Sequence, residues 1–320
     1  MITMRVNRWA LMGLLLALVL QAPSWAAAQT TFGRIVVFGD SLSDPGNLFA
    51  LVGGANTPPY DTLDQLLIPD KPYAKGGHHF SNGATWVEEL ARPLGLAGNT
   101  RPAFQGSGTE ATNYAVGGAR AHEDGINVNL SFQVNTFLNA FGGVAPADTL
   151  YVVEFGSNDI RDALAAGAGG GAILGDALTA IGNNMGVLYA AGARKFLVCN
   201  APDLSLTPAI LTLDKFTPGA GPFAQFLTVT YNSGLDSLLG SMAGLPGIEI
   251  VRIDFFQKLN EMVAAPAAFG LSVVDTACVT PNTPPYACQK PDEFLFWDGT
   301  HPTKAVHAII SQEAALALAN

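Results

Sequence analysis

The stretch RIVVFGDSLSD, residues 34–44, decides the fold and carries the first candidate site residue. Its first six residues, RIVVFG, are β-branched or apolar without polar alternation, which is typical of a strand buried on both faces. The polar residues Asp40 and Ser41 end this apolar run. We therefore predict a buried strand over 34–39 that presents a serine at its carboxyl end.

Four further runs have the same character, and segments with helical spacing separate them. The runs are TNYAV (112–116), LYVVEF (150–155), KFLVC (195–199) and IEIVRI (248–253). Alternation of strand and helix predicts a parallel sheet with helices on both faces. We expect an α/β fold, a flavodoxin-like three-layer α/β/α sandwich with a five-stranded parallel sheet. The last helix is predicted to begin near Pro302, with Thr300 or His301 as its cap.

The first 28 residues have the pattern of a signal peptide. Arg5 and Arg8 precede the apolar run 9–20, and small residues follow at 26–28. The apolar run is shorter than the roughly 20 residues that a spanning helix needs, so we expect no stable membrane anchor. The prediction is a signal peptide over 1–28, a single mature domain over 29–320, and export to the periplasm or the medium.

The charge and the motifs of the chain limit the classes of partner and cofactor that we expect. The chain has 16 basic and 26 acidic residues, a formal charge of −10, and without residues 1–28 the charge becomes −12. Such a surface repels phosphate backbones, so we expect no nucleic-acid partner, and we expect a monomer. The glycine-rich run 167–172 follows a helical pattern rather than a strand, which argues against a dinucleotide site. We expect no cofactor and no metal.

The three cysteines are expected to have two different roles. Cys278 and Cys288 lie ten residues apart in one loop, and in an exported protein a disulfide between them is the natural hypothesis. Cys199 ends an apolar run and is expected to be a buried free thiol.

Polar and glycine residues follow three of the predicted strands. Ser41 follows the first, Gly117 and Gly118 follow the second, and Asn158 follows the third. Ligands of parallel sheets gather at the carboxyl ends of strands, so these positions offer a nucleophile and hydrogen-bond donors. Asn158 could alternatively only cap the next helix. Near the end of the chain, Asp298 precedes His301 by three residues, a spacing that lets the carboxylate orient the imidazole toward Ser41.

Four segments resemble the diagnostic blocks of the SGNH, or GDSL, esterase and lipase family. They are FGDSLSD (38–44), NYAVGGA (113–119), GSND (156–159) and WDGTHP (297–302), in the order that the family has them. The resemblance implies the SGNH-hydrolase fold, with Ser41 as nucleophile, His301 as general base and Asp298 as the residue that orients it. It also implies an oxyanion hole formed by the backbone N–H groups of Ser41 and Gly118 and the amide of Asn158.

The context of these blocks resembles the exported lipase and acylhydrolase branch of the family. That branch implies a serine ester hydrolase that acts on acyl lipids or small acyl esters through an acyl-Ser41 intermediate. An O-acetyl esterase acting on polysaccharide uses the same residues, and an exported ligand-binding protein that has lost catalysis is the alternative of another class. The side chains of Phe294, Phe296 and Trp297 could line an apolar acyl site or pack beneath the loop of the base.

Overall fold

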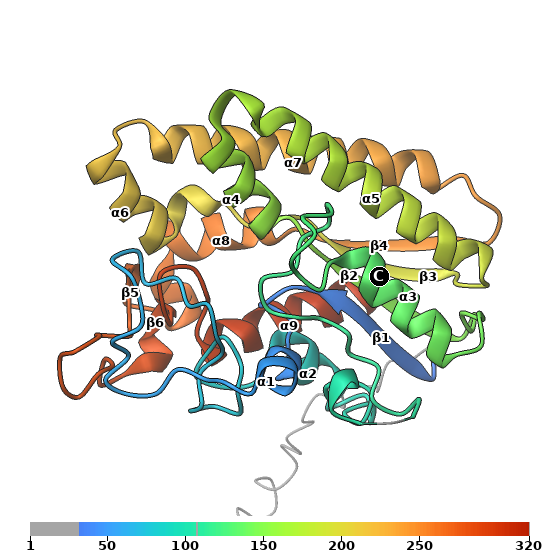
Figure 1. Ribbon diagram of the computed structural model, residues 1–320, viewed down its shortest axis with the longest axis horizontal. Helices are drawn as coiled ribbons and strands as arrows, with labels where there is room; N and C mark the ends of the chain where they lie inside the picture. The colour runs from blue at the N-terminus through green and yellow to red at the C-terminus, as the bar shows by residue number, and fades with distance from the viewer. Residues whose placement is uncertain (1–31, 107, 320) are drawn as a thin grey trace, which may run out of the picture. The chain divides into compact units, whose positions relative to one another are not determined.

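A parallel four-stranded sheet forms the centre of the fold. The computed structural model describes residues 32–106 and 108–319, so the predicted signal peptide lies outside the described residues. The strands are β1 (Arg34–Gly39), β2 (Thr149–Glu154), β3 (Lys195–Cys199) and β4 (Glu249–Ile253), in the order β1-β2-β3-β4 (Figure 1). They coincide within one residue with four of the five predicted runs.

Helices alternate with these strands along the chain, as predicted. Within the described residues they are α1 (Asn47–Val52), α2 (Trp86–Ala91), α3 (Leu130–Ala140), α4 (Ser157–Ala166), α5 (Gly170–Ala190), α6 (Pro208–Phe216), α7 (Ala220–Met242), α8 (Phe255–Ala264) and α9 (Lys304–Ala319).

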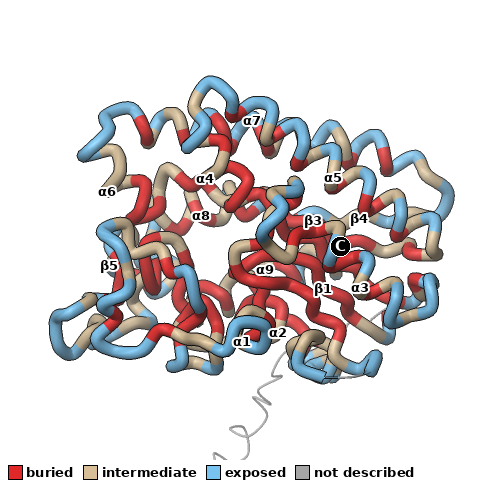
Figure 2. The backbone as a smooth tube through the Cα atoms, viewed as in Figure 1, coloured by how far each residue is buried: buried red, intermediate tan, exposed pale blue. Residues whose placement is uncertain are grey.

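The two faces of the sheet are buried by different helices, which makes the three-layer α/β/α sandwich. On one face, Val36 and Phe38 of β1 belong to a core that includes residues of α3, α4, α5 and α7. On the other face, Ile35 and Val37 pack with residues of α2, α8 and α9. Figure 2 shows the buried strands between helices whose outer sides are exposed. Successive strand residues point to opposite faces, which is why an unbroken apolar run fits here.

The prediction of a fifth strand over 112–116 is wrong. Asn113 forms one parallel bridge with Val37, and the N–H of Val116 also donates to the carbonyl of Gly39 at 3.1 Å. Side-chain amides take the N–H groups on either side of Val37: that of Ile35 donates to Oδ1 of Asn99 at 3.1 Å, and that of Gly39 donates to Oε1 of Gln133 at 3.0 Å. Because these two N–H groups are taken, the segment pairs with β1 through a few backbone bonds and forms no continuous ladder.

A second, smaller sheet was not predicted. It pairs β5 (Val273–Ala277) with β6 (Phe294–Phe296) in parallel. The segment that follows β6 also explains why the last helix begins later in the chain than predicted. The N–H of Trp297 donates to the carbonyl of His301 at 2.7 Å, so residues 300–302 belong to a turn and α9 begins only at Lys304.

One apolar helical stretch passes a length and composition test for a membrane span. Within the described residues it is Ser157–Ala190, in which a window of 18 residues has a mean hydropathy of 1.4. In the fold this stretch is two helices, because the backbone turns at Gly167, where φ is 56°. Figure 1 shows α4 and α5 meeting at an angle, and both pack against α7.

Candidate active site

Ser41 lies in a tight turn at the carboxyl end of β1. The N–H of Leu42 donates to Oδ1 of Asp40 at 2.9 Å, and the N–H of Ser43 donates to the carbonyl of Asp40 at 3.2 Å. The next helix, α1, begins only at Asn47. The turn around Asp40, rather than the first turn of a helix, therefore fixes the serine.

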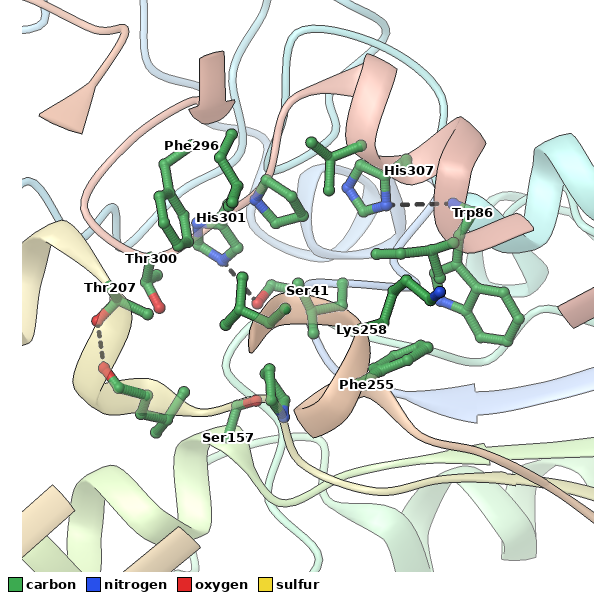
Figure 3. A pocket seen from close by; sticks show the side chains of 18 of the residues that line it. Ser41, Trp86, Ser157, Thr207, Phe255, Lys258, Phe296, Thr300, His301 and His307 are labelled. Carbon is green, nitrogen blue, oxygen red and sulfur yellow. Dashed lines mark hydrogen bonds between the residues drawn. The ribbon is translucent and has the colours of Figure 1, made fainter. Parts of the chain in front are cut away.

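The structure brings Ser41, His301 and Asp298 together. Nε2 of His301 lies 2.8 Å from Oγ of Ser41, and Nδ1 lies 2.8 Å from Oδ2 of Asp298. Figure 3 shows the imidazole directed at the serine hydroxyl. All three residues are buried. In this arrangement Nδ1 carries a hydrogen toward the carboxylate, and Nε2 can accept the proton of the hydroxyl.

Asp298 is held by donors from two parts of the chain. Its Oδ1 accepts the N–H groups of Thr300 at 2.9 Å and His301 at 2.8 Å, and its Oδ2 accepts the hydroxyl of Tyr73 at 2.9 Å. Tyr73 belongs to the long segment between α1 and α2. Its hydroxyl is buried beside the carboxylate, and both effects raise the pKa of Tyr73, so it stays a donor.

A glycine lets this segment approach the turn of the base. A Cβ atom at Gly299 would lie 1.9 Å from the carbonyl oxygen of Leu66, so no side chain fits there. The N–H of Gly299 donates to the carbonyl of Leu67 at 2.9 Å. The turn from Asp298 to His301 is thus clamped between β6 and the 60–70 segment.

Two backbone donors at the site have no acceptor within the described part of the chain. They are the N–H groups of Ser41 and Gly118. Gly118 has a φ of 79°, the left-handed region that favours glycine. Its neighbours Gly117 and Ala119 donate instead to Asp44 and Val116.

The side chain of Asn158 is held at both ends. Its Nδ2 donates to Oδ2 of Asp40 at 3.2 Å and to the carbonyl of Ala119 at 3.0 Å. Its Oδ1 accepts a hydrogen bond from Nη1 of Arg161 at 3.2 Å. A guanidinium can only donate, so this contact fixes the amide with Nδ2 facing the turn of the serine. Asn158 is the second residue of α4, but its side chain makes no capping bond.

A pair of buried carboxyl groups lies beneath this turn. Asp40 and Glu154 are 1% and 2% exposed, and each influences the titration of the other. Burial raises the pKa of Asp40 to about 6. Burial and the nearby charge of Asp40 raise the pKa of Glu154 well above its usual value. The hydroxyl of Ser43 donates to Oε2 of Glu154 at 3.0 Å and accepts the indole N–H of Trp86 at 3.1 Å.

A pocket with an empty volume of about 750 Å³ opens beside Ser41. Most of its walls are apolar, and they come from α2, α8, β6 and α9 as well as from the loop after β3. The apolar and aromatic side chains are Leu42, Trp86, Pro202, Leu204, Phe255, Leu259, Met262, Leu295, Phe296, Val306 and Ile310. Of the three aromatic residues flagged in the sequence, Phe296 lines this pocket, whereas Trp297 packs with Tyr73.

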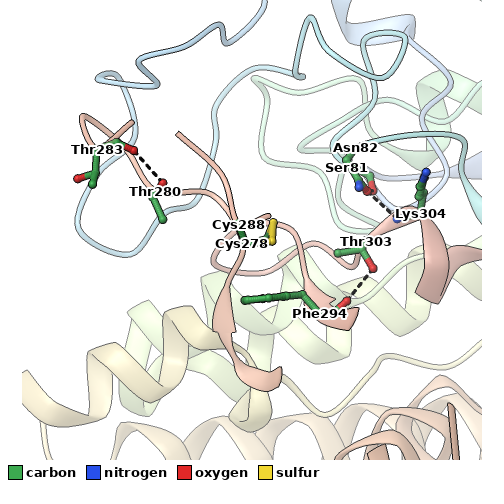
Figure 4. Close-up of a disulfide and its surroundings, with 9 residues drawn as sticks. All are labelled: Ser81, Asn82, Cys278, Thr280, Thr283, Cys288, Phe294, Thr303 and Lys304. Atoms are coloured by element: carbon green, nitrogen blue, oxygen red, sulfur yellow. Dashed lines mark hydrogen bonds between the residues drawn. A yellow bond between two sulfur atoms is a disulfide. The ribbon is translucent and has the colours of Figure 1, made fainter. Parts of the chain in front are cut away.

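The structure contains a disulfide between Cys278 and Cys288 (Figure 4). It closes the loop between β5 and β6, and Cys199 is a buried free thiol. The N–H of Cys278 donates to the carbonyl of Phe296 at 3.1 Å, and the N–H of Val279 donates to that of Trp297 at 2.9 Å. The bridged loop therefore supports the segment that leads into Asp298.

Two other histidines pair with carboxylates of the fold. Nε2 of His79 pairs with Glu88 at 2.8 Å, and Nδ1 of His122 pairs with Asp159 at 2.7 Å. His307 lines the pocket, and its Nδ1 accepts the N–H of Trp86 at 3.2 Å. The described chain offers no group of three His, Cys, Asp or Glu side chains that could hold a metal ion.

Three residues at the site were missed by sequence reasoning. Tyr73 has no local signal, because its role depends on a contact 225 residues away. Glu154 did have a local signal, because a lone acidic residue inside the apolar run LYVVEF must be buried together with hydrogen-bond partners. Arg161 lies one helical turn after Asn158, and this spacing places the two side chains on one face of α4.

Comparison with known proteins agrees with this architecture. The family described as GDSL-like Lipase/Acylhydrolase matches residues 35–314. A GDSL esterase/lipase of Arabidopsis thaliana is 27% identical, over 88% of this chain and 84% of its own length. A phosphatidylcholine-sterol acyltransferase of Aeromonas hydrophila is 28% identical, over 97% of this chain and 96% of its own. A thermolabile hemolysin of Vibrio parahaemolyticus is 25% identical, over 88% of this chain and 62% of its own.

The family match spans almost all of the described residues and includes the sheet, Ser41 and His301. The chain belongs to the GDSL-like lipase/acylhydrolase family and is a carboxylic ester hydrolase.

Proposed function

We propose that this protein hydrolyses acyl esters by attack of Ser41 on the ester carbonyl, with His301 as general base and Asp298 as its orienting residue. The observation that carries the proposal is the pair of 2.8 Å contacts from one imidazole, Nε2 to Ser41 and Nδ1 to Asp298. A serine hydroxyl is a weak nucleophile until a base accepts its proton, and this geometry supplies the base.

In the first step, Oγ of Ser41 forms a bond to the carbonyl carbon while His301 takes its proton. The carbonyl oxygen becomes an oxyanion, which the N–H groups of Ser41 and Gly118 and the amide of Asn158 are positioned to receive. His301 then returns the proton to the leaving alcohol, which leaves an acyl-Ser41 ester. Water hydrolyses this ester by the same steps, with His301 again as base.

The amide of Asn158 must change partner for this role. Its Nδ2 already donates to Asp40 and to the carbonyl of Ala119, and the bond to Asp40, at 3.2 Å, is the longer of the two. We propose that the oxyanion shares or takes this hydrogen, because a full negative charge is a stronger acceptor than a buried carboxyl whose pKa is raised.

The pocket favours an acyl chain longer than acetyl. Its walls near the serine are apolar and aromatic, and burying each methylene of a chain there is worth about 0.8 kcal/mol. We therefore place acyl lipids or medium-chain esters ahead of O-acetylated polysaccharide. The transfer of the acyl group to another alcohol, as the name of the Aeromonas relative describes, would use the same acyl-Ser41 ester.

Two measurements on purified protein test the proposal. A fluorophosphonate probe should label the wild type on Ser41 and leave Ser41→Ala unlabelled, with both proteins folded. Chromogenic esters of graded chain length should give a kcat/KM that rises beyond acetyl, and Leu259→Trp, which fills the pocket, should shift the optimum to shorter chains. Labelling of Ser41→Ala, or a wild type that turns over no ester, would refute the mechanism.

The export of the protein also remains a proposal. Residues 1–28 have the charge and apolar pattern of a signal peptide, and a disulfide is typical of proteins in oxidising compartments. N-terminal sequencing of protein recovered from the periplasm or medium should begin near Gln29.

A further inference from the structure

Arg161 is a cation without a carboxylate partner at the edge of the site. It lines the pocket that contains Ser41, and its recorded contact within the described chain is the bond to Oδ1 of Asn158. The neighbouring Asp162 is taken by Arg120, whose Nε lies 2.8 Å from Oδ2 of Asp162. Burial, followed by the like charge of Arg120, lowers the pKa of Arg161, and the charges of Asp162, Asp40 and Asp64 oppose this shift without reversing it. Within the described residues, this partly desolvated positive charge therefore has no carboxylate at ion-pair distance.

The second cation of the pocket has a different environment. Nζ of Lys258 lies 2.6 Å from Glu261 and 3.0 Å from Glu313, so its charge is compensated within the protein. Two other arginines of the described chain that lack a carboxylate, Arg34 and Arg194, each lie over an aromatic ring and donate to backbone carbonyls. Within the described residues, Arg161 has neither an ion pair of this kind nor an aromatic ring beneath its guanidinium group.

A second polar group near Arg161 also lacks a partner within the described chain. Oγ of Ser157, the residue before Asn158, is buried, belongs to a residue that lines the pocket and has no hydrogen-bond partner among the described residues. An unpaired buried hydroxyl is unfavourable, and a ligand oxygen that bonds to it would remove that cost. Ser157 and Arg161 thus form a polar wall next to the amide of Asn158.

The two sides of the pocket differ in the polar groups that they leave open. Figure 3 shows Trp86, Phe255 and Lys258 on one side of Ser41, and Ser157, Thr207, Thr300 and Phe296 on the other. An ester bound with its carbonyl at Ser41 extends its acyl chain in one direction and its alcohol in the other. The side of Trp86 and Phe255, where the charge of Lys258 is ion-paired, suits the acyl chain, so the alcohol lies toward Ser157 and Arg161.

We propose that Arg161 binds an anionic oxygen group, such as a phosphate, carried on the alcohol portion of the ester. This inference rests on the proposed function and adds to it the direction of the substrate and the charge of its alcohol. The protein as a whole is strongly acidic, so one cation without an ion-pair partner in the described pocket is the feature that would select such a substrate against general repulsion.

The test uses two soluble substrates with the same acyl ester, 1-hexanoylglycerol 3-phosphate and 1-hexanoylglycerol. Replacing Arg161 by Gln should lower kcat/KM for both esters, and the loss should be about 10- to 100-fold greater for the phosphate ester than for the neutral ester. This range is the effect expected from losing a hydrogen bond between charged groups. Any loss common to both substrates reports the support that Arg161 gives to Asn158. Arg161→Lys should restore part of the selectivity, and Lys258→Gln, in the same pocket, should leave it unchanged.

The outcomes separate this inference from the function on which it rests. If wild type labels at Ser41 and hydrolyses 1-hexanoylglycerol, but Arg161→Gln loses equal activity toward both substrates, the anion-binding role is wrong and the hydrolase stands. If wild type hydrolyses neither and Ser41 does not label, the proposed function itself fails. A further experiment adds inorganic phosphate to the assay with 1-hexanoylglycerol. Inhibition of wild type that is weaker in Arg161→Gln supports the anion-binding site at Arg161. Equal inhibition of wild type and Arg161→Gln contradicts it.

Discussion

The hydroxyl of Tyr73 donates a 2.9 Å hydrogen bond to Oδ2 of Asp298, the same oxygen that lies 2.8 Å from Nδ1 of His301. One carboxylate oxygen thus accepts from the base and from a tyrosine in the segment before α2. The tyrosine ring is itself fixed edge-on between Tyr60 and Trp297. The orientation of the base therefore depends on a segment far from it in the chain.

Tyr73→Phe should lower kcat while leaving the fold intact. The variant removes one of the donors to Asp298, and a hydrogen bond to a charged group is worth about 1.5–3 kcal/mol, so we expect a loss of about tenfold or more in kcat. Steady-state kinetics over a range of pH measures it. Tyr60→Phe is the matched control, because Tyr60 packs on the same ring without a recorded bond to Asp298. Equal kinetics for the two variants would show that the hydroxyl has no role.

Asn158→Ala should lower kcat by about 10² to 10³, the usual effect of removing one oxyanion donor. The substitution also removes bonds to Asp40 and Ala119, so some stability is lost as well. Asn184→Ala separates the two effects, since Asn184 is a buried amide of α5 that bonds to Ser131 and Ala180. We expect both variants to unfold at a lower temperature and only Asn158→Ala to lose activity. A kcat near that of wild type for Asn158→Ala would remove this residue from the mechanism.

The buried pair Asp40 and Glu154 should make stability fall as pH rises. Both folded-state pKa values are raised, Asp40 to about 6 and Glu154 well above its usual value. The folded protein therefore binds more protons than the unfolded chain above about pH 4, and the stability that the protonated forms provide is lost as pH rises through the folded pKa values.

Glu154→Gln removes one of the two titrating groups and keeps an oxygen that can accept from Ser43. We expect its melting temperature to decline less than that of wild type between about pH 5 and pH 8. Glu110→Gln, at an exposed ion pair, is the control and should follow the wild-type curve. Parallel curves for Glu154→Gln and wild type would mean that the pair does not titrate in this range.

Loss of the Cys278–Cys288 disulfide should reduce activity before it unfolds the protein. The bridged loop donates backbone hydrogen bonds to Phe296 and Trp297, directly before Asp298. A variant with serine at both positions is expected to lose about 2–4 kcal/mol of stability and to show a lower kcat at temperatures where its circular dichroism is still native. Cys199→Ser, at the buried free thiol, should not show that pattern. Activity that persists up to the melting temperature would mean that the bridge acts only globally.

Most of the fold could be predicted from the sequence because its signals are local. The runs at 34–39, 150–155, 195–199 and 248–253 are apolar over the length of a strand, and each lies between helical patterns. The four family blocks identified the residues that the structure places around Ser41. The residues within each run are therefore enough to predict the strand that the run forms.

The parts that failed depend on contacts between distant residues. The run 112–116 has the composition of a strand and bonds to Val37 and Gly39, but amides of Asn99 and Gln133 take two of the N–H groups that a full ladder would need. The start of α9 was misplaced because Trp297 pairs with His301. The role of Tyr73 at Asp298 likewise appears only when the segment before α2 is folded against the base.

The side-chain amides on β1 have a consequence for how molecules of this protein meet. A strand at the border of a sheet normally presents a row of open N–H and C=O groups, to which a strand of another molecule can attach. Here the backbone of 112–116 bonds to Val37 and to the carbonyl of Gly39, and the side chain of Gln133 bonds to both main-chain groups of Gly39, at 3.0 and 2.9 Å. Intermolecular β-pairing, and the fibrous aggregation that grows from it, is thereby blocked along this border even though the chain forms no fifth strand.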